Sequence, residues 1–96
     1  MMNCSNCTVE GFVTSDPETR ITKTGKKVYT FNLAINQYDE PPRVSFLHVE
    51  EWDKDTELKK GNRILVAGIL RQDRWEDEKG KVRSRIKVIA NEIRIL

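Results

Sequence analysis

The sequence predicts an all-β domain: a small closed barrel of five strands, with one short helical turn between the third and fourth strands. Stretches of alternating apolar and polar residues recur along the chain, and turn residues separate them. No strand is followed by a long helix and a second strand, as a parallel α/β sheet would require. The 96 residues suffice for one modest core, so we expect a single domain over residues 1–96.

The first part of the chain predicts two strands. Residues 8–14 (TVEGFVT) form a short strand in which Gly11 indicates a bulge or a close backbone approach. Residues 20–22 add a short extended piece before a turn. Residues 27–36 (KVYTFNLAIN) alternate strictly. The face of this second strand expected in the core carries Tyr29, Phe31, Leu33 and Ile35.

Residues 44–52 (VSFLHVEEW) form the expected third strand, after a loop at residues 37–43 that contains two prolines. Alternation places Leu47 and Val49 toward the core and a mixed set of side chains on the other face. This other face carries Phe46, His48, Glu50 and Trp52. Two interpretations remain open: its rings form a platform on which bases stack, or they pack under a loop or against another subunit.

The segment after the third strand predicts about one helical turn over residues 53–60, capped by Asp53 or Asp55 and ended by Gly61. Residues 63–75 form the fourth strand, which is apolar on both faces. The core face is expected to carry Ile64, Val66, Gly68 and Leu70. A chain of this size has little with which to cover the opposite face. We therefore infer a subunit interface centred on Leu65, Ala67 and Ile69.

The fourth and fifth strands are expected to form one long hairpin that closes at a polar turn over residues 77–80. In the fifth strand, residues 82–96, a slip in alternation near residues 88–90 indicates a bulge. Beyond its apolar base the hairpin is basic and carries Trp75. Such a ribbon suits a polyanion with stackable bases, and a charged hairpin that only keeps the protein soluble is the alternative.

The net charge is only +2, but the charges are unevenly distributed. Basic residues cluster within residues 20–27 and 71–87, and acidic residues cluster within residues 50–57. A fold that separates these clusters would carry one positive face, where a phosphate backbone could lie. The acidic cluster is interpreted as a solvated edge.

No enzyme motif is present: the sequence has no phosphate-binding loop and no G-x-S-x-G, and His48, the only histidine, has no evident partner. Cys4 and Cys7 supply two zinc ligands where a tetrahedral site needs four. We interpret them as incidental, with metal or redox use, including a site shared between subunits, as the alternative. We expect no metal, no cofactor and no catalytic residue. The longest apolar run, residues 64–70, is too short to span a membrane, and the polar N-terminus does not resemble a signal peptide. A cytoplasmic location is expected.

Side chains that suit single-stranded nucleic acid are more numerous. The rings that can stack on bases are Phe46, Trp52, Trp75 and Tyr38. The cations that can neutralise phosphates are Lys27, Arg71, Arg74, Lys81, Arg83 and Arg85. No helix is long enough to enter a major groove, so these side chains favour single strands over duplex and sequence-tolerant binding over base-specific readout.

Five short motifs in a fixed order carry a resemblance to a known family. They are V-x-G-x-V at 9–13, D-P-E-x-R-x-T at 16–22, F-x-L-A-x-N at 31–36, K-G-x-R-I-x-V-x-G at 60–68 and L-R-x-x-x-W-x-D-x-x-G at 70–80. Over nearly its whole length the chain resembles the bacterial-type single-stranded DNA-binding proteins. The strand count and the position of the helical turn also match the oligonucleotide/oligosaccharide-binding (OB) barrel.

The resemblance implies an OB barrel that forms homodimers or homotetramers and protects single-stranded DNA during replication, recombination and repair, associated with the nucleoid. By position, Phe46 and Trp75 match stacking residues of that family, Trp52 matches an aromatic at the end of the third strand, and His48 matches a polar or basic DNA contact. Tyr38 lies near a further stacking position. The main alternative is an accessory barrel of the primosome type that acts through protein contacts, and the second is a purely structural interaction module.

Four features depart from that family. The chain stops at Leu96 without the acidic C-terminal tail, so we expect a short form, and contacts with replication proteins would not use such a tail. The segment before Lys60 is shorter than usual, and the first strand is more polar. Glu50 on the expected DNA face is unfavourable for a polyanion.

Overall fold

The computed structural model describes residues 5–54 and 56–96, and this part of the chain contains strands and no helix. The strands are β1 (Asn6–Val13), β2 (Glu18–Ile21), β3 (Lys27–Gln37), β4 (Arg43–Trp52), β5 (Arg63–Glu76) and β6 (Val82–Ile95). The expected all-β class is therefore confirmed. The short extended piece expected at residues 20–22 is a strand of its own, β2, which pairs with β3, so the described sheet has six strands where five were expected.

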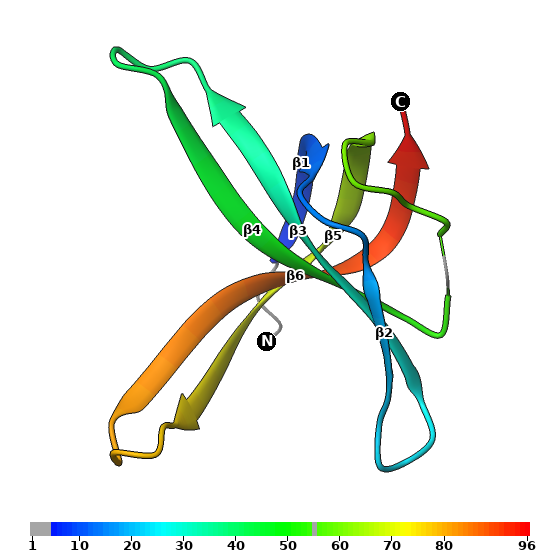
Figure 1. Ribbon diagram of the computed structural model, residues 1–96, viewed down its shortest axis with the longest axis vertical. Helices are drawn as coiled ribbons and strands as arrows, with labels where there is room; N and C mark the ends of the chain where they lie inside the picture. Colours follow the sequence, from blue (N-terminus) through cyan, green and yellow to red (C-terminus); the bar gives the residue numbers. More distant parts are fainter. Residues whose placement is uncertain (1–4, 55) are drawn as a thin grey trace.

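Strand pairing closes five of these strands into a ring. The sheet order is β1-β5-β6-β4-β3-β2, and an additional pairing of β1 with β3 joins the two ends of the five-stranded part. All pairs are antiparallel except β4 with β6, which is parallel. Figure 1 shows the strands crossing at the centre of the molecule, with the β3–β4 and β5–β6 hairpins projecting from it.

The ring closes where β1 passes from β5 to β3. Phe12 pairs with Arg63 of β5 on one side and with Ala34 of β3 on the other. A Cβ atom on Gly11 would overlap the carbonyl oxygen of Ala34. Of the two readings of Gly11, the close backbone approach is therefore correct, because only glycine lets the two strands come this near.

The core lies inside the ring and follows the predicted alternation. Tyr29, Phe31 and Leu33 of β3 are buried, and Ile35 and Leu47 pack against the cluster as partly buried residues. The remaining buried members of the cluster are Val13, Val49, Leu58, Ile64, Val66 and Val88. Local alternation was sufficient to find most of these positions, because the side chains on one face of each strand point into the closed ring.

Leu70 is the exception among the predicted core residues, since its side chain is 45% exposed. Alternation is not at fault: Leu70 pairs with the buried Val88 and lies on the core side of β5. The pairing of β1 with β5 ends at Ile69, however, and residues 71–86 pair only within the β5–β6 hairpin. We call residues 71–86 the β5–β6 arm. Leu70 stands where the arm leaves the ring, with too little structure around it for burial.

The expected bulge of β6 is present but lies slightly later than residues 88–90. Ala67 pairs with Glu92 and the next residue, Gly68, pairs with Ala90, so Asn91 is the extra residue. A Cβ atom on Gly68 would overlap the carbonyl oxygen of Ile89. The bulge thus brings two backbones together at a position that accepts only glycine.

The helical turn expected over residues 53–60 is wrong for every described residue of that segment. A helix cap holds its backbone in the extended region, whereas Asp53 has a left-handed φ of 58° and donates its N–H to the carbonyl of Lys27. Asp55, the alternative cap, lies outside the described residues. The chain therefore turns away after β4 instead of starting a helix.

Side chains of the ring bind backbone N–H groups of this segment. Glu51, buried on the core side of β4, accepts hydrogen bonds from the N–H (3.1 Å) and the hydroxyl (3.1 Å) of Thr56. The Leu58 N–H donates to the Tyr29 hydroxyl at 3.3 Å, and the Leu58 side chain enters the core. These contacts offer the backbone an alternative to a helix.

Candidate nucleic-acid interface

The outer face of β4 is the side of this strand that points away from the core. The predicted alternation is confirmed for these residues: Val49 on the core face is buried, and Phe46 on the outer face is 71% exposed. His48, also on the outer face, is half-buried. Trp52 at the end of β4 is also exposed. Glu50 differs from the expectation, because it belongs to this face and is nevertheless buried, with 4% exposure.

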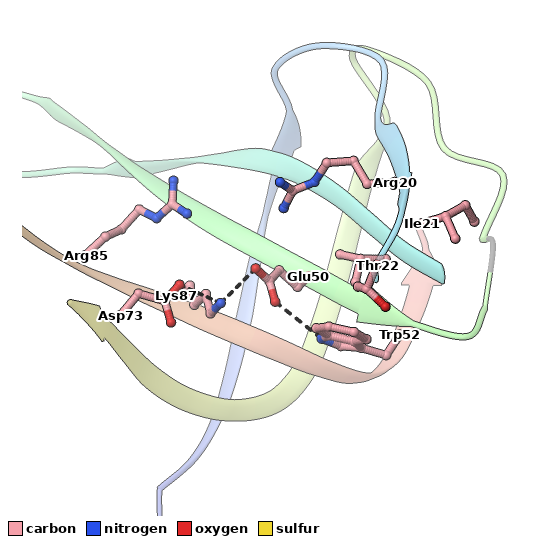
Figure 2. A pocket seen from close by; sticks show the side chains of 9 residues that line it. Arg20, Ile21, Thr22, Glu50, Trp52, Asp73, Arg85 and Lys87 are labelled. Carbon is pink, nitrogen blue, oxygen red and sulfur yellow. Dashed lines mark hydrogen bonds and ion pairs between the residues drawn. The ribbon is translucent and has the colours of Figure 1, made fainter. Parts of the chain in front are cut away.

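Glu50 is buried because two side chains cover and bind its carboxylate. The Lys87 ammonium lies 2.8 Å from Oε1, and the Trp52 indole N–H donates to Oε2 at 3.3 Å. Lys87 itself lies 2.6 Å from Oδ2 of Asp73 on β5. Figure 2 shows this chain of contacts along the floor of a cleft. The interpretation of residues 50–57 as a solvated acidic edge is therefore wrong for Glu50, and also for the buried Glu51.

The Lys87 ammonium contacts two carboxylates at once. Burial acts to lower the pKa of Lys87, but its hydrogen bonds with Asp73 and Glu50 outweigh burial and raise this pKa above its ordinary value. The hydrogen bond from Lys87 also lowers the pKa of Asp73. The charge of Glu50, unfavourable for a polyanion in isolation, is thus matched by a cation in direct contact.

Above this floor lies a cleft of about 340 Å³. Its lining comes from the end of β2 and the residue after it, from β3 and β4, and from the β5–β6 arm and its base. The lining residues are Arg20, Ile21, Thr22, Val28, Glu50, Trp52, Asp73, Arg85 and Lys87. Figure 2 shows the Arg20 and Arg85 guanidinium groups beside the Glu50–Lys87 pair. The cleft combines one exposed indole ring with three cations and two carboxylates. Lys87 contacts both carboxylates, and the two guanidinium groups add the positive charge that suits a base and its phosphates.

His48 lies on the outer face of β4 between Phe46 and Glu50. Its Nδ1 is 3.3 Å from Oδ1 of Asn32, its Nε2 is 3.9 Å from the Glu50 carboxylate, and its side chain is 16% exposed. Burial lowers the pKa of His48. The positive charges of Arg85, Lys87 and Arg20 lower this pKa further, and the negative charge of Glu50 raises it. At pH 7 the ring is neutral, so it can offer a polar contact but no charge.

The β5–β6 arm separates the predicted residues onto two faces. In its register Arg71 pairs with Lys87, Asp73 with Arg85 and Trp75 with Arg83, so the cleft side of the arm carries Trp75 and most of its cations. Trp75 lies 5.9 Å from the Arg85 guanidinium, measured to the ring centroid. Arg74 pairs with Ser84 and therefore lies on the opposite face. The structure does not bring Arg74 together with the other predicted cations.

Asp77 organises the tip of the arm, in agreement with the predicted turn. Its carboxylate accepts hydrogen bonds from the N–H groups of Lys79 (3.0 Å) and Lys81 (2.9 Å) and lies 3.1 Å from Nε of Arg83. The Lys81 and Arg83 bonds, with that of Lys79, lower the pKa of Asp77. Gly80 closes the turn with a φ of 77°, a conformation that glycine adopts without strain.

The other predicted residues lie apart from the cleft. Lys27 is half-buried at the start of β3, and Lys81 is exposed near the arm's tip. Tyr38 is 93% exposed in the β3–β4 loop and lines a different cleft. On the outward face of β5 the predicted interface residues Leu65, Ala67 and Ile69 are half-buried within the chain. Their role in an oligomer remains a prediction.

The cysteine pair is only partly described. Cys7 is a free, half-buried thiol that packs against the core, and Cys4 lies outside the described residues. In the described part of the chain, no three His, Cys, Asp or Glu side chains gather as metal ligands would. No helix among the described residues has the length and apolarity needed to cross a membrane.

A family model described as the single-strand binding protein family matches residues 4–96. The chain belongs to this family.

Curated relatives agree with this membership. A single-stranded DNA-binding protein of Treponema pallidum is 31% identical over 100% of the chain, and one of Corynebacterium glutamicum is 34% identical over 93% of it. The chain spans 60% and 45% of the lengths of these two relatives. It spans 85% of single-stranded DNA-binding protein 1 of Synechocystis, with 32% identity over 99% of the chain.

A solved structure with the same fold is the Plasmodium falciparum SSB in complex with single-stranded DNA. It superposes on this chain with a TM-score of 0.88 and shares 22% sequence identity with it. The superposition covers 100% of this chain and 97% of the Plasmodium chain. At this identity the likeness establishes the shared fold. This member of the single-strand binding protein family therefore shares its fold with a solved protein.

The sequence analysis did not identify two residues of the candidate interface, Arg20 and Phe12. Arg20 lines the cleft, although it was only counted in a basic cluster; its place in the D-P-E-x-R motif was the available signal. Phe12 is 41% exposed on β1 and shares a cross-strand row with Phe46 through Ala34. No local pattern shows this row, because it depends on the pairing of β1 with β3.

Proposed function

We propose that this chain is a non-enzymatic, sequence-tolerant single-stranded DNA-binding protein. It binds by base stacking and phosphate neutralisation and protects single strands in replication, recombination and repair, in the cytoplasm and in association with the nucleoid. The ring of strands described above acts as a five-stranded OB barrel with β2 as an added strand. Homodimers or homotetramers present several such barrels to one DNA strand.

The observation that carries this proposal is the continuity between the outer face of β4 and the cationic cleft. Phe46 and Trp52 expose rings along one strand face, and Arg20 and Arg85 add positive charge at its end. Stacking on aromatic rings contributes about 1–3 kcal/mol per base and tolerates any base, since every base has a π-face. The Glu50–Lys87 contact supports the proposal further, because it removes the repulsion that an unpaired carboxylate would exert on DNA.

A fluorescence titration tests the proposal directly. The chain has two tryptophans, Trp52 and Trp75, so Trp75→Phe leaves the cleft ring as the sole reporter and Trp52→Phe leaves the arm ring. Oligo-dT should quench both single-tryptophan proteins at low salt. The logarithm of the affinity should fall linearly with the logarithm of the salt concentration, by about 0.7 per neutralised phosphate.

The same titration separates this function from its alternative. A protein that acts mainly through protein contacts would leave both tryptophans unquenched by oligo-dT even at low salt, and it would retain a replication protein in a pull-down. Parallel titration with oligo-U measures the preference between DNA and RNA. Phe46→Ala serves as the stability control: it should weaken binding while thermal unfolding stays close to that of the wild type, because the ring is exposed.

A further inference from the structure

A second cleft, of about 310 Å³, lies at the seam where β1 pairs with β3. Its lining residues come from β1, from the end of β3 and its loop, and from the start of β5: Glu10, Gly11, Phe12, Asn36, Tyr38 and Arg63. Two of its side chains are exposed aromatic rings, with Phe12 exposed to 41% and Tyr38 to 93%. Exposed rings that flank a cleft are available to a ligand with flat faces.

The strand register joins this cleft to the outer face of β4. Phe12 pairs with Ala34, and Ala34 pairs with Phe46, so the three side chains form one cross-strand row on the same side of the sheet. Two strand spacings separate the two phenylalanines, or about 10 Å. The side chain between the two phenylalanines is the small methyl group of Ala34, and both rings are exposed. The rings of β4 and β1 therefore form one continuous surface.

The second cleft also contains a cation that forms an ion pair with an exposed carboxylate. The Arg63 guanidinium donates to the Glu10 carboxylate from Nη2 at 2.6 Å and from Nε at 2.9 Å, and both side chains are about half exposed. Exposed ion pairs contribute little stability and are screened by salt. A phosphate group arriving at the cleft can therefore replace Glu10 as the partner of Arg63.

We propose that Phe12, Tyr38 and Arg63 form a second nucleotide-binding subsite, which extends the path of single-stranded DNA from the Trp52 cleft across Phe46 to the β1–β3 seam. Phe12 and Tyr38 stack bases there, and Arg63 binds phosphate. The proposal deepens the proposed function and rests on it. It also predicts that a short oligonucleotide, which fills only the first cleft, will not reach the seam, whereas a longer one will.

Oligonucleotides of two lengths test this subsite in the Trp75→Phe protein, where Trp52 reports occupancy of the first cleft. Lengths of about 5 and about 16 nucleotides bracket the range of site sizes for one OB barrel. Phe12→Leu, which keeps apolar bulk and removes the ring, should raise the Kd for the long oligo-dT by about 5- to 100-fold and leave the Kd for the short one unchanged. Glu10→Gln should tighten binding of the long strand selectively, because it releases Arg63.

A reporter at the site itself gives the control. In a Trp52→Phe/Trp75→Phe background, Phe12→Trp places the sole tryptophan in the second cleft, and the long oligonucleotide should quench it while the short one should not. Equal effects of Phe12→Leu on both lengths, or no effect on either, would overturn the second subsite while leaving the proposed function standing. A wild-type protein that binds neither length would overturn both.

Discussion

The Lys87 ammonium lies 2.8 Å from the Glu50 carboxylate across the parallel pair of β4 and β6, and both side chains are buried. The contact joins two requirements of the same surface. It neutralises a carboxylate on the face that carries Phe46 and Trp52, and it leaves the other carboxylate oxygen to hold the Trp52 indole N–H. Lys87 therefore affects both the stability of the ring and the position of the Trp52 ring in the cleft.

Removal of Lys87 should destabilise the protein strongly. Lys87→Met leaves Glu50 buried without its cation, and an uncompensated buried charge costs about 3–5 kcal/mol in the free energy of unfolding. Glu50→Gln should cost less, because Lys87 retains Asp73 at 2.6 Å. Urea denaturation of both variants measures the two losses.

The double variant provides the decisive comparison for this pair. Lys87→Met with Glu50→Gln removes both charges, so most of the stability lost in Lys87→Met should return. If the two single losses simply add in the double variant, Lys87 and Glu50 do not act as a pair, and the interpretation of the contact fails.

Stability should also fall when His48 becomes protonated. Its folded-state pKa lies below the ordinary value of 6.5, so below that pH the unfolded chain binds more protons than the folded one. The free energy of unfolding must then decrease as the pH falls, by at most about 1.4 kcal/mol per pH unit, until the pH passes below the folded-state pKa. Thermal unfolding between pH 7.5 and 5 measures this slope.

His48→Gln is the matched control for the pH series, because it keeps a polar side chain opposite Asn32 and does not titrate. The slope near pH 6 should disappear in this variant. A loss of stability that remains at lower pH belongs to Asp73 and Asp77, whose lowered pKa values stabilise the folded state above about pH 4 and stabilise it less as acid protonates them. An unchanged slope near pH 6 in His48→Gln would contradict the assignment to His48.

Local patterns were enough to predict the five strands of the ring, the core face of β3 and the turn at Asp77, because alternation and turn chemistry act over a few residues. The Glu50–Lys87 contact could not be predicted in this way. It joins residues 37 positions apart and depends on the parallel pairing of β4 with β6, which no local pattern encodes. The row that joins Phe12 to Phe46 through Ala34 could not be predicted either, because it depends on the pairing of β1 with β3 that closes the ring.

Two errors have a common physical origin in tertiary contacts that override local preference. The helical turn after β4 failed because Glu51 and Tyr29 bind the N–H groups of Thr56 and Leu58. The burial of Leu70 failed because the β5–β6 arm extends past the ring, where alternation persists but the core does not. Periodicity reports which way a side chain points, and burial requires a second element opposite it.

Arg20 and Arg74 offer a matched test of the cleft. Both arginines are exposed, but Arg20 lines the cleft and Arg74 lies on the far face of the arm. Arg20→Ala should weaken binding of oligo-dT and reduce the magnitude of the salt slope by about 0.7, the value for one phosphate contact on a single strand. Arg74→Ala should change neither quantity. Equal effects of the two substitutions would indicate a diffuse charge effect and contradict a defined cleft.

The outward face of β5 makes a separate prediction about assembly. Leu65 lies on that face between Glu10 of β1 and Arg94 of β6, and it is half-buried within one chain. Association through this face would bury Leu65 fully, so Leu65→Lys would place an ammonium in the contact between subunits, where removing a charge from water is strongly unfavourable. The molar mass from light scattering should fall from that of a dimer or tetramer toward that of the monomer.

Leu70→Lys is the control for this substitution, because Leu70 is an exposed leucine at the base of the arm and outside the expected interface. It makes the same chemical change and should leave the molar mass unaltered. Circular dichroism of both variants establishes that each remains folded. If Leu65→Lys keeps the wild-type mass, or if Leu70→Lys lowers the mass equally, subunits do not associate through Leu65, Ala67 and Ile69.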